Sequence, residues 1–92
     1  GDTLTVRLRR DFNLMTVRHL HYHLDNATRL RIDLSKARLV DTEAVMALHR
    51  LKRKGIDVTL LEPPDIFYEV LEVLELASAF DVEHLVERQR AG

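Results

Sequence analysis

The feature that most constrains this chain is a regular alternation of strand-like and helix-like segments along its 92 residues. Three segments have the apolar patterning of strands, namely 3–9, 29–34 and 56–61. Three segments have helical spacing, namely 14–25, 43–54 and 66–79. Residues 82–86 predict a last short strand or a helical turn. This order predicts an α/β fold, with a mixed sheet of about four strands and helices packed mainly on one face.

The second helical segment has the clearest signals at both of its ends. Asp41 and Thr42 are residue types that cap a helix, and Glu43 places a negative charge in the first turn. Basic residues occupy the last turn, and Gly55 follows directly. The sequence therefore predicts a helix over 43–54.

Length and composition predict one domain over residues 1–92, because a chain of this size supports one modest core. Zero cysteines exclude disulfides, thiolate metal sites and cysteine catalysis. No apolar run approaches the roughly 18 residues of a membrane span, so we expect no direct insertion into a membrane. No secretion signal is recognisable, and we expect a cytoplasmic protein.

The net charge of −1 conceals two halves of opposite sign. Residues 1–54 contain 12 Lys and Arg against 6 Asp and Glu, whereas residues 55–92 contain 2 against 9. If the fold separates these halves, the domain is dipolar and can steer a charged partner. The alternative is that neighbouring elements neutralise each other.

The junction at residues 39–44 is the strongest candidate for a functional site. An apolar approach from the sheet leads to Thr42, a hydroxyl residue at the start of a helix. Unpaired backbone N–H groups and the helix dipole favour negative charge at that place, so it tolerates a phosphoryl group on Thr42. The simpler alternative is that Asp41 and Thr42 only cap the helix.

Residues 31–45 resemble the signature of STAS domains, the fold of bacterial anti-sigma factor antagonists. In that signature a strand leads into "DLS", then a few mixed residues, then an aspartate followed by a hydroxyl residue and a helix. Asp33, Leu34 and Ser35 match the first part, and Asp41 with Thr42 matches the second. The resemblance covers about residues 28–83, and the part before it is shorter than is usual in the family.

The resemblance implies a regulatory protein-interaction module in signalling and transcription regulation, with no active site of its own. In anti-sigma factor antagonists the hydroxyl residue after the aspartate is phosphorylated by a kinase anti-sigma factor, which breaks their complex. Thr42 stands at that position and is the expected phospho-acceptor. Nucleotide and Mg²⁺ would belong to the kinase, so no cofactor is expected for this chain.

The same resemblance supports a second interpretation, a STAS subunit of an ABC-type lipid transporter. There the equivalent of Thr42 contacts the ATPase and is not phosphorylated. One departure from the family concerns both interpretations: Glu43 and Ala44 replace a small residue and a glycine. The carboxylate of Glu43 opposes phosphorylation of its neighbour by like-charge repulsion, or supplies a permanent charge in its place.

A docking face for the protein partner is predicted on the helix at 43–54. A helical wheel places Met46, Arg50 and Arg53 opposite the apolar side of this helix. An apolar, flexible residue among arginines is a common composition for interfaces. The alternative is a solvated face with one exposed methionine.

The third helical segment suggests a homodimer through residues 66–80. Its apolar residues extend almost around the helix, and four of them are candidates for exposure: Phe67, Tyr68, Val73 and Leu76. The alternative is that the helix lies deep between the sheet and another helix.

Two other classes of function find weaker support. His19 and His23 share a helix face and suggest a small metal-binding domain, but zinc needs a third and usually a fourth ligand. Arg7, Arg9 and Arg10, together with residues 50–54, suggest a nucleic-acid patch. Aromatic residues make up only 5% and the pI is about 6.6, so we expect no nucleic-acid partner. No catalytic motif is present, and we expect no enzyme.

Overall fold

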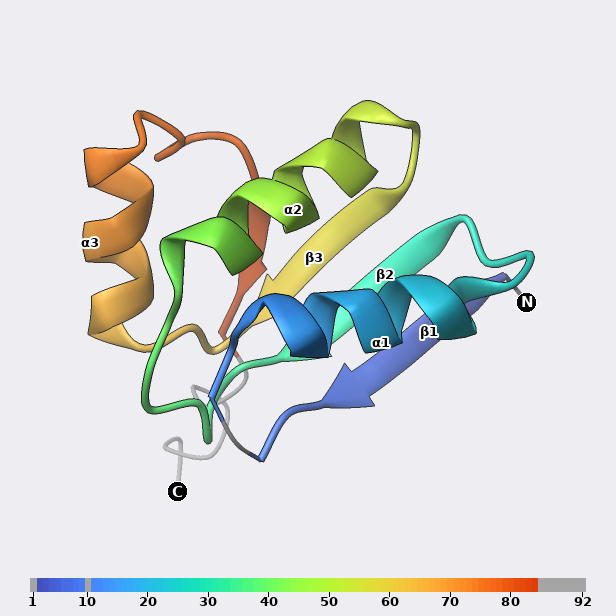
Figure 1. Cartoon of the computed structure of the whole chain (residues 1–92), viewed down its shortest axis with the longest axis horizontal. Helices are drawn as coiled ribbons and strands as arrows, with labels where there is room; N and C mark the ends of the chain where they lie inside the picture. The colour runs from blue at the N-terminus through green and yellow to red at the C-terminus, as the bar shows by residue number, and fades with distance from the viewer. Residues whose placement is uncertain (1, 10, 85–92) are drawn as a thin grey trace, which may run out of the picture.

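The computed structural model describes residues 2–9 and 11–84, which form an α/β arrangement of alternating strands and helices (Figure 1). The strands are β1 (Thr3–Arg7), β2 (Arg29–Asp33), β3 (Asp57–Leu61) and β4 (Asp81–Glu83). The helices are α1 (Leu14–Leu24), α2 (Thr42–Arg53) and α3 (Asp65–Val73). The predicted order and α/β class are thus confirmed. The last predicted segment is a strand, although its residues 85 and 86 lie outside the described part.

The sheet has the spatial order β1-β2-β3-β4, and every described pair of neighbouring strands is parallel. The mixed sheet expected from the sequence is therefore wrong for the described strands. The physical reason is that a helix follows each of the first three strands and returns the chain to the same end of the sheet. Strand order in space consequently repeats strand order in the sequence.

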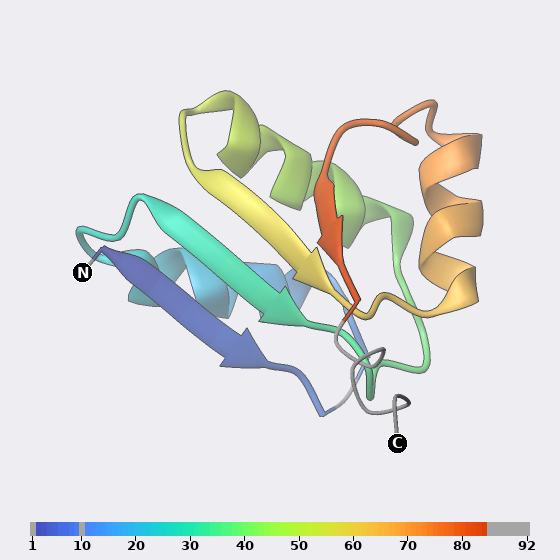
Figure 2. The same ribbon diagram turned by 180° about the vertical axis from the view of Figure 1, so that it is seen from behind.

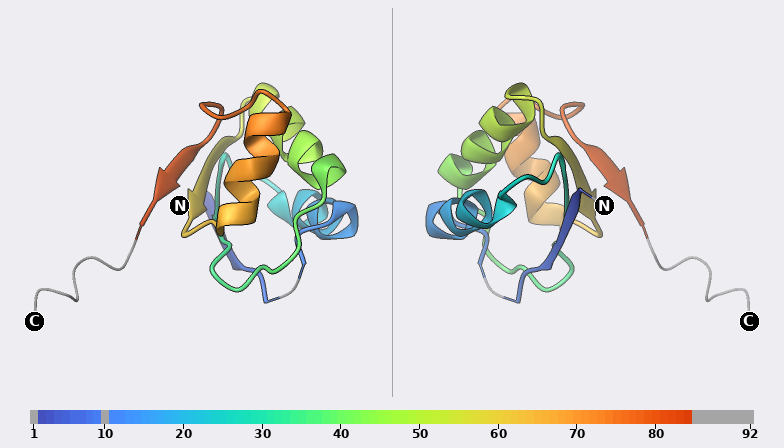
Figure 3. Two further views of the ribbon diagram at one scale, coloured as in Figure 1. Left: turned by 90° about the vertical axis from the view of Figure 1, so that its left-hand side faces the viewer. Right: turned by 90° about the vertical axis from the view of Figure 1, so that its right-hand side faces the viewer.

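The helices cover one face of the sheet and leave the other face bare among the described residues (Figures 2 and 3). Alternate strand residues such as Leu30, Ile32 and Val58 are fully buried beneath the helices. Their neighbours Arg31 and Thr59 point to the bare face, because successive side chains of a strand point in opposite directions. The expectation of helices mainly on one face is confirmed.

The first two helices begin close to the predicted residues. The side chain of Asn13 caps α1 by accepting a hydrogen bond from the backbone N–H of Thr16 at 3.0 Å. Asp41 caps α2 in the same way, and Gly55 follows that helix with a φ of +107°. A glycine adopts this left-handed conformation without the steric cost that a Cβ imposes, which explains the end of the helix.

The third helix is shorter than the predicted 66–79, because it ends at Val73. Glu75 has a φ of +60°, and the backbone N–H of Leu76 bonds back to Leu71 at 2.7 Å. This turn directs the chain toward Phe80, which is buried. The apolar residues after Val73 thus contact the core from a turn and not from a helix. Their spacing in the sequence matches that of a helix, which explains why the predicted helix is too long.

The fold separates the two charged halves of the sequence. The described residues 55–84 carry eight Asp and Glu and no Lys or Arg, and they form β3, α3 and β4 at one side of the sheet. The described Lys and Arg of the earlier residues lie on β1, α1, β2, α2 and the loops that follow these elements. Because strand order follows sequence order, an asymmetry along the chain becomes a dipole across the domain.

Candidate partner-docking site

The start of α2 is held by the backbone of the loop that precedes α1. Phe12 and Val40 form a parallel bridge. The N–H of Phe12 donates to the carbonyl of Leu39 at 2.8 Å, and the N–H of Asp41 donates to the carbonyl of Phe12 at 2.9 Å. Phe12 itself is fully buried. The segment around residue 41 therefore has a defined position next to the start of α1.

Asp41, and not Thr42, caps α2. The carboxylate of Asp41 accepts a hydrogen bond from the backbone N–H of Glu43 at 2.9 Å. Thr42 is exposed, and its hydroxyl makes no hydrogen bond to any residue in the described ranges. Helix capping therefore does not require the hydroxyl of Thr42, which leaves it accessible to a partner or a kinase.

The residues after Thr42 differ in what they contact. Glu43 is exposed, so its carboxylate stays in water beside the hydroxyl of Thr42. Ala44 is fully buried in the core. The alanine that replaces the glycine of the STAS signature thus contributes packing, whereas the glutamate changes the charge of the accessible surface.

Exposed apolar side chains lie on both sides of Thr42. Leu39 is 64% exposed in the preceding loop, and Met46 is 45% exposed one helical turn further along. The role of Met46 was predicted from the helical wheel, but Leu39 was not singled out. One sequence signal could have identified Leu39. It is an apolar residue in a loop, outside any strand or helix pattern that would place it in the core.

Thr42 shares one stripe of α2 with the three predicted docking residues. Met46 follows at i+4, Arg50 at i+8 and Arg53 at i+11, and residues at these spacings lie on one side of a helix. All four are exposed. The structure thus brings the candidate phospho-acceptor and the candidate docking face into one continuous surface, which we call the α2 stripe.

Asp33 of the "DLS" run supports the loop that leads to α2. Its carboxylate accepts a hydrogen bond from the backbone N–H of Ser35 at 2.9 Å and pairs with the Nε of Arg7 at 3.4 Å. Partial burial acts to raise the pKa of Asp33. The hydrogen bonds from Ser35 and the charge of Arg7 outweigh burial and keep that pKa below its usual value.

Comparison with known proteins rests on structure alone. No protein-family model matches the chain, and no curated protein matches it by sequence. A search of solved structures finds the anti-sigma factor antagonist SpoIIAA in its unphosphorylated form, with a TM-score of 0.68 and 14% sequence identity. The match covers 98% of this chain and 85% of SpoIIAA. The chain has a STAS-like fold.

The histidines of this STAS-like domain lie on an exposed part of α1. The rings of His19 and His23 are 6.2 Å apart between centroids, as their i,i+4 spacing requires. Within residues 2–9 and 11–84, no three His, Cys, Asp or Glu side chains gather in a way that could hold a metal ion. Two histidines alone leave zinc short of ligands.

The two basic clusters considered for nucleic acid lie at opposite ends of the STAS-like domain. Arg7 is the last residue of β1, Arg9 lies two residues further along, and Arg10 lies outside the described residues. Residues 50–54 close α2, and the backbone bond from Ile56 to Leu51 places them near the amino end of β3. The joint patch that was considered as an alternative does not form among the described residues, because α2 runs about 18 Å from one end of the sheet toward the other.

No helix in the described ranges combines the length and the apolar character needed to cross a membrane.

Proposed function

We propose that this chain is a regulatory protein-interaction module whose docking to a kinase-type partner is controlled at Thr42. The observation that carries the proposal is the accessible hydroxyl at the start of α2, on a stripe with Met46 and Arg50. The structural likeness to an anti-sigma factor antagonist supports the same class of function. In this proposal the module acts in bacterial transcription signalling, in the cytoplasm, without chemistry of its own.

A phosphoryl group on Thr42 would change the partner surface more than the helix. It adds about −1.5 to −2 charges near the N-terminus of α2, where the helix dipole offsets part of the cost. The added charge would stand beside the carboxylate of Glu43 and between the apolar side chains of Leu39 and Met46. Repulsion and the desolvation of charge at an apolar contact both weaken the complex.

The first experiment is affinity purification of the tagged protein from its native host, with mass spectrometry of the protein and its partners. Recovery of a kinase partner with phosphate on part of Thr42 is the expected result. Recovery of an ABC-type ATPase with unmodified Thr42 supports the transporter-subunit alternative and overturns the phosphorylation proposal.

The partner found in this way allows a quantitative test. Thr42→Glu should weaken the complex at least about tenfold, which corresponds to about 1.4 kcal/mol. Thr42→Ser keeps the hydroxyl and should bind as the wild type does. Thr5→Glu makes the same charge change on the bare face of the sheet and should have no effect. Unchanged affinity of Thr42→Glu contradicts control at this residue.

A homodimer through α3 is a second proposal, which the structure changes in detail. Phe67 is fully buried and Leu76 packs partly against the core, so neither is available as the expected exposed residue. Tyr68 and Val73 are 39% and 78% exposed, and they are the α3 residues on which we now base the dimer. Val73→Lys should yield a folded monomer in analytical ultracentrifugation. A wild type that is monomeric at high concentration contradicts the proposal.

A further inference from the structure

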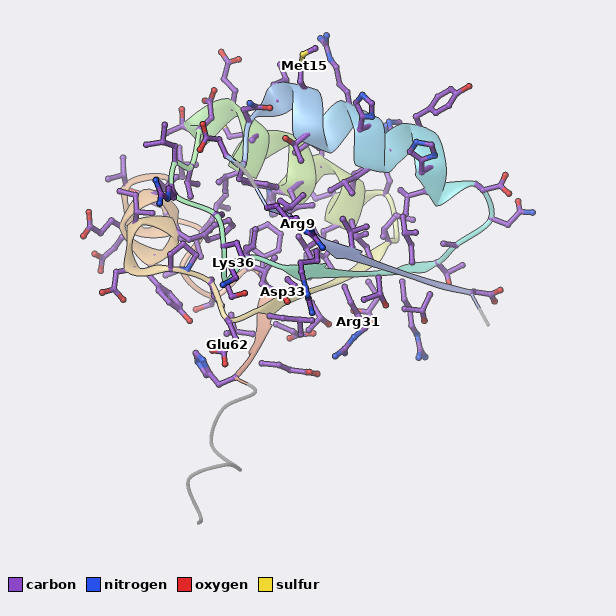
Figure 4. All side chains as sticks on the ribbon, turned by 90° about the horizontal axis from the view of Figure 1, so that it is seen from below. Arg9, Met15, Arg31, Asp33, Lys36 and Glu62 are labelled. Atoms are coloured by element: carbon purple, nitrogen blue, oxygen red, sulfur yellow. The ribbon has the colours of Figure 1, made fainter. Side chains whose placement is uncertain are left out.

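A concave, basic surface lies at the carboxyl end of β1 and β2, and no residue of the α2 stripe lines it. Two loops form it, the one after β1 and the one after β2. A cavity of about 630 Å³ is lined by four basic residues and one acidic residue, namely Arg7, Arg9, Lys36, Arg38 and Asp11. Figure 4 shows Arg9, Lys36 and Asp33 at this end of the sheet. We call this surface the carboxyl-edge groove.

The groove continues toward α1 and becomes partly apolar. A second cavity of about 640 Å³ shares Arg7, Arg9 and Asp11 with the first and extends to Leu8 and Met15. Leu8 is 9% exposed and Met15 is 67% exposed. The two cavities therefore form one elongated groove with a strongly basic end and an end that offers apolar contact.

Most of the positive charge in the groove is not neutralised within the described ranges. Arg7 pairs with Asp33, whose other oxygen accepts from the N–H of Ser35. Arg9, Lys36 and Arg38 have no hydrogen bond or ion pair to any described residue, and all three side chains are exposed. Three cations thus face solvent from a concave surface, where field lines concentrate and attract anions.

The charges of the other described residues determine from which side an acidic ligand approaches the groove. The described residues 55–84 carry eight carboxylates and no Lys or Arg, and they form β3, α3 and the edge strand β4, on the side of the sheet away from β1. An acidic ligand is therefore repelled by the β4 side and attracted to the β1 side. Such a dipole orients an acidic partner during its approach.

We propose that the carboxyl-edge groove binds an extended acidic segment of a protein partner. Arginine pairs with carboxylates through two parallel N–H donors, which suits Arg9 and Arg38 to glutamate or aspartate side chains. The exposed side chain of Met15 provides contact for an apolar residue next to the acidic ones. The groove does not include Thr42, so this inference stands apart from the proposed control by phosphorylation.

Peptide fits the groove better than nucleic acid or membrane does. Among the described residues no Phe, Tyr or Trp lines either cavity, and His19 is the single ring there, whereas single-stranded nucleic acid binds by stacking successive bases on several aromatic residues. Polybasic membrane-binding clusters lie on one amphipathic helix or beside a membrane-spanning helix, whereas here the basic residues come from the end of β1 and two loops and surround Asp11.

The test is fluorescence anisotropy with a labelled peptide of eight glutamates and two leucines. We expect binding to the wild-type protein that weakens as salt is raised, because the contacts are charged and exposed. Arg9→Glu/Arg38→Glu should reduce affinity at least about tenfold, and Arg9→Gln/Arg38→Gln should reduce it by less. Thr42→Glu should leave peptide binding unchanged, which separates this proposal from the preceding one.

The matched control is Arg18→Glu/Lys52→Glu, which makes the same charge change on exposed helix residues outside the groove. We expect it to bind the peptide within about threefold of the wild type. Equal losses in the control and the groove variant, with both folded by circular dichroism, overturn the groove as the site. Absence of peptide binding, or tighter groove-dependent binding of a single-stranded oligonucleotide or of phosphatidylserine vesicles, overturns an acidic peptide as its ligand.

Discussion

The basic half of the domain, from β1 to α2, is built more regularly than the acidic half, from β3 to β4. Its helices have 11 and 12 residues, each begins with a side-chain cap, and its two strands pair over five residues. In the acidic half, α3 has 9 residues and no side-chain cap, and β4 has three residues. The acidic half therefore depends more on contacts made across the domain than on local signals.

Two contacts carry much of that dependence. The buried rings of Phe12 and Phe67 meet at 5.6 Å between centroids and join the loop before α1 to α3. On the bare face, the guanidinium of Arg31 donates two hydrogen bonds to the carboxylate of Glu83, at 2.9 and 3.2 Å. This pair reaches from β2 over β3 to β4 and holds the short edge strand.

The largest expected effect is the loss of the aromatic contact between the halves. Phe67→Ala removes a fully buried ring and should lower the free energy of unfolding by about 3–5 kcal/mol. Urea unfolding followed by circular dichroism measures this change. If the two halves form one cooperative unit, the variant still unfolds in one transition. An early separate transition would show that the acidic half unfolds by itself.

A smaller effect should distinguish the helix starts of the two halves. Asp41→Ala removes a side-chain cap and should cost about 1 kcal/mol in the free energy of unfolding. Asp65→Ala removes only a charge in the first turn of α3, so it should cost about 0.3–0.5 kcal/mol. Both are measured by urea unfolding. Equal costs would contradict the claim that α2 has a working side-chain cap and α3 has none.

The smallest effect concerns the pH dependence of the Arg31–Glu83 pair. The hydrogen bonds from Arg31 keep the pKa of Glu83 below its usual value. A lowered pKa in the folded state contributes stability above the ordinary carboxyl pKa, and this contribution is lost as pH falls through the lowered value.

Glu83→Gln should therefore have a lower melting temperature than the wild type near about pH 7, and the difference should shrink toward about pH 3. Asp57→Gln is the control, because Asp57 is an exposed carboxylate of β3 for which the described residues offer no ion pair. A Glu83→Gln difference that stays constant or grows on acidification contradicts a role for the charged pair.

Local signals predicted much of the fold but failed where the chain depends on distant contacts. The ends of α2 were close to correct, because Asp41 and Gly55 act on residues next to them in sequence. The end of α3 was wrong because Leu74 and Leu76 continue an apolar spacing, whereas the core contact of Phe80 draws the chain into a turn. Periodicity cannot distinguish a helix from a turn when both present apolar residues to the core.

The residues of the candidate site could be predicted from the sequence, but the role of each residue could not. Thr42 and Met46 were found from a signature and a helical wheel. The assignment of the cap to Asp41 alone required the hydrogen bond to Glu43. Leu39 was missed because its exposure depends on the bridge between Phe12 and Val40, which joins segments far apart in the chain.

The α/β class, the order of the elements and the opposite charges of the two halves follow from the residues in their order along the chain. These properties depend on neighbouring residues, through alternation, helical spacing and capping. Three other properties appear only when the chain is folded: the sheet is parallel, the charged halves lie on different sides of it, and Arg9 and Lys36 meet at one groove. The physical reason is that strand pairing joins segments about 25 residues apart, and a local pattern carries no information about which edge they will share.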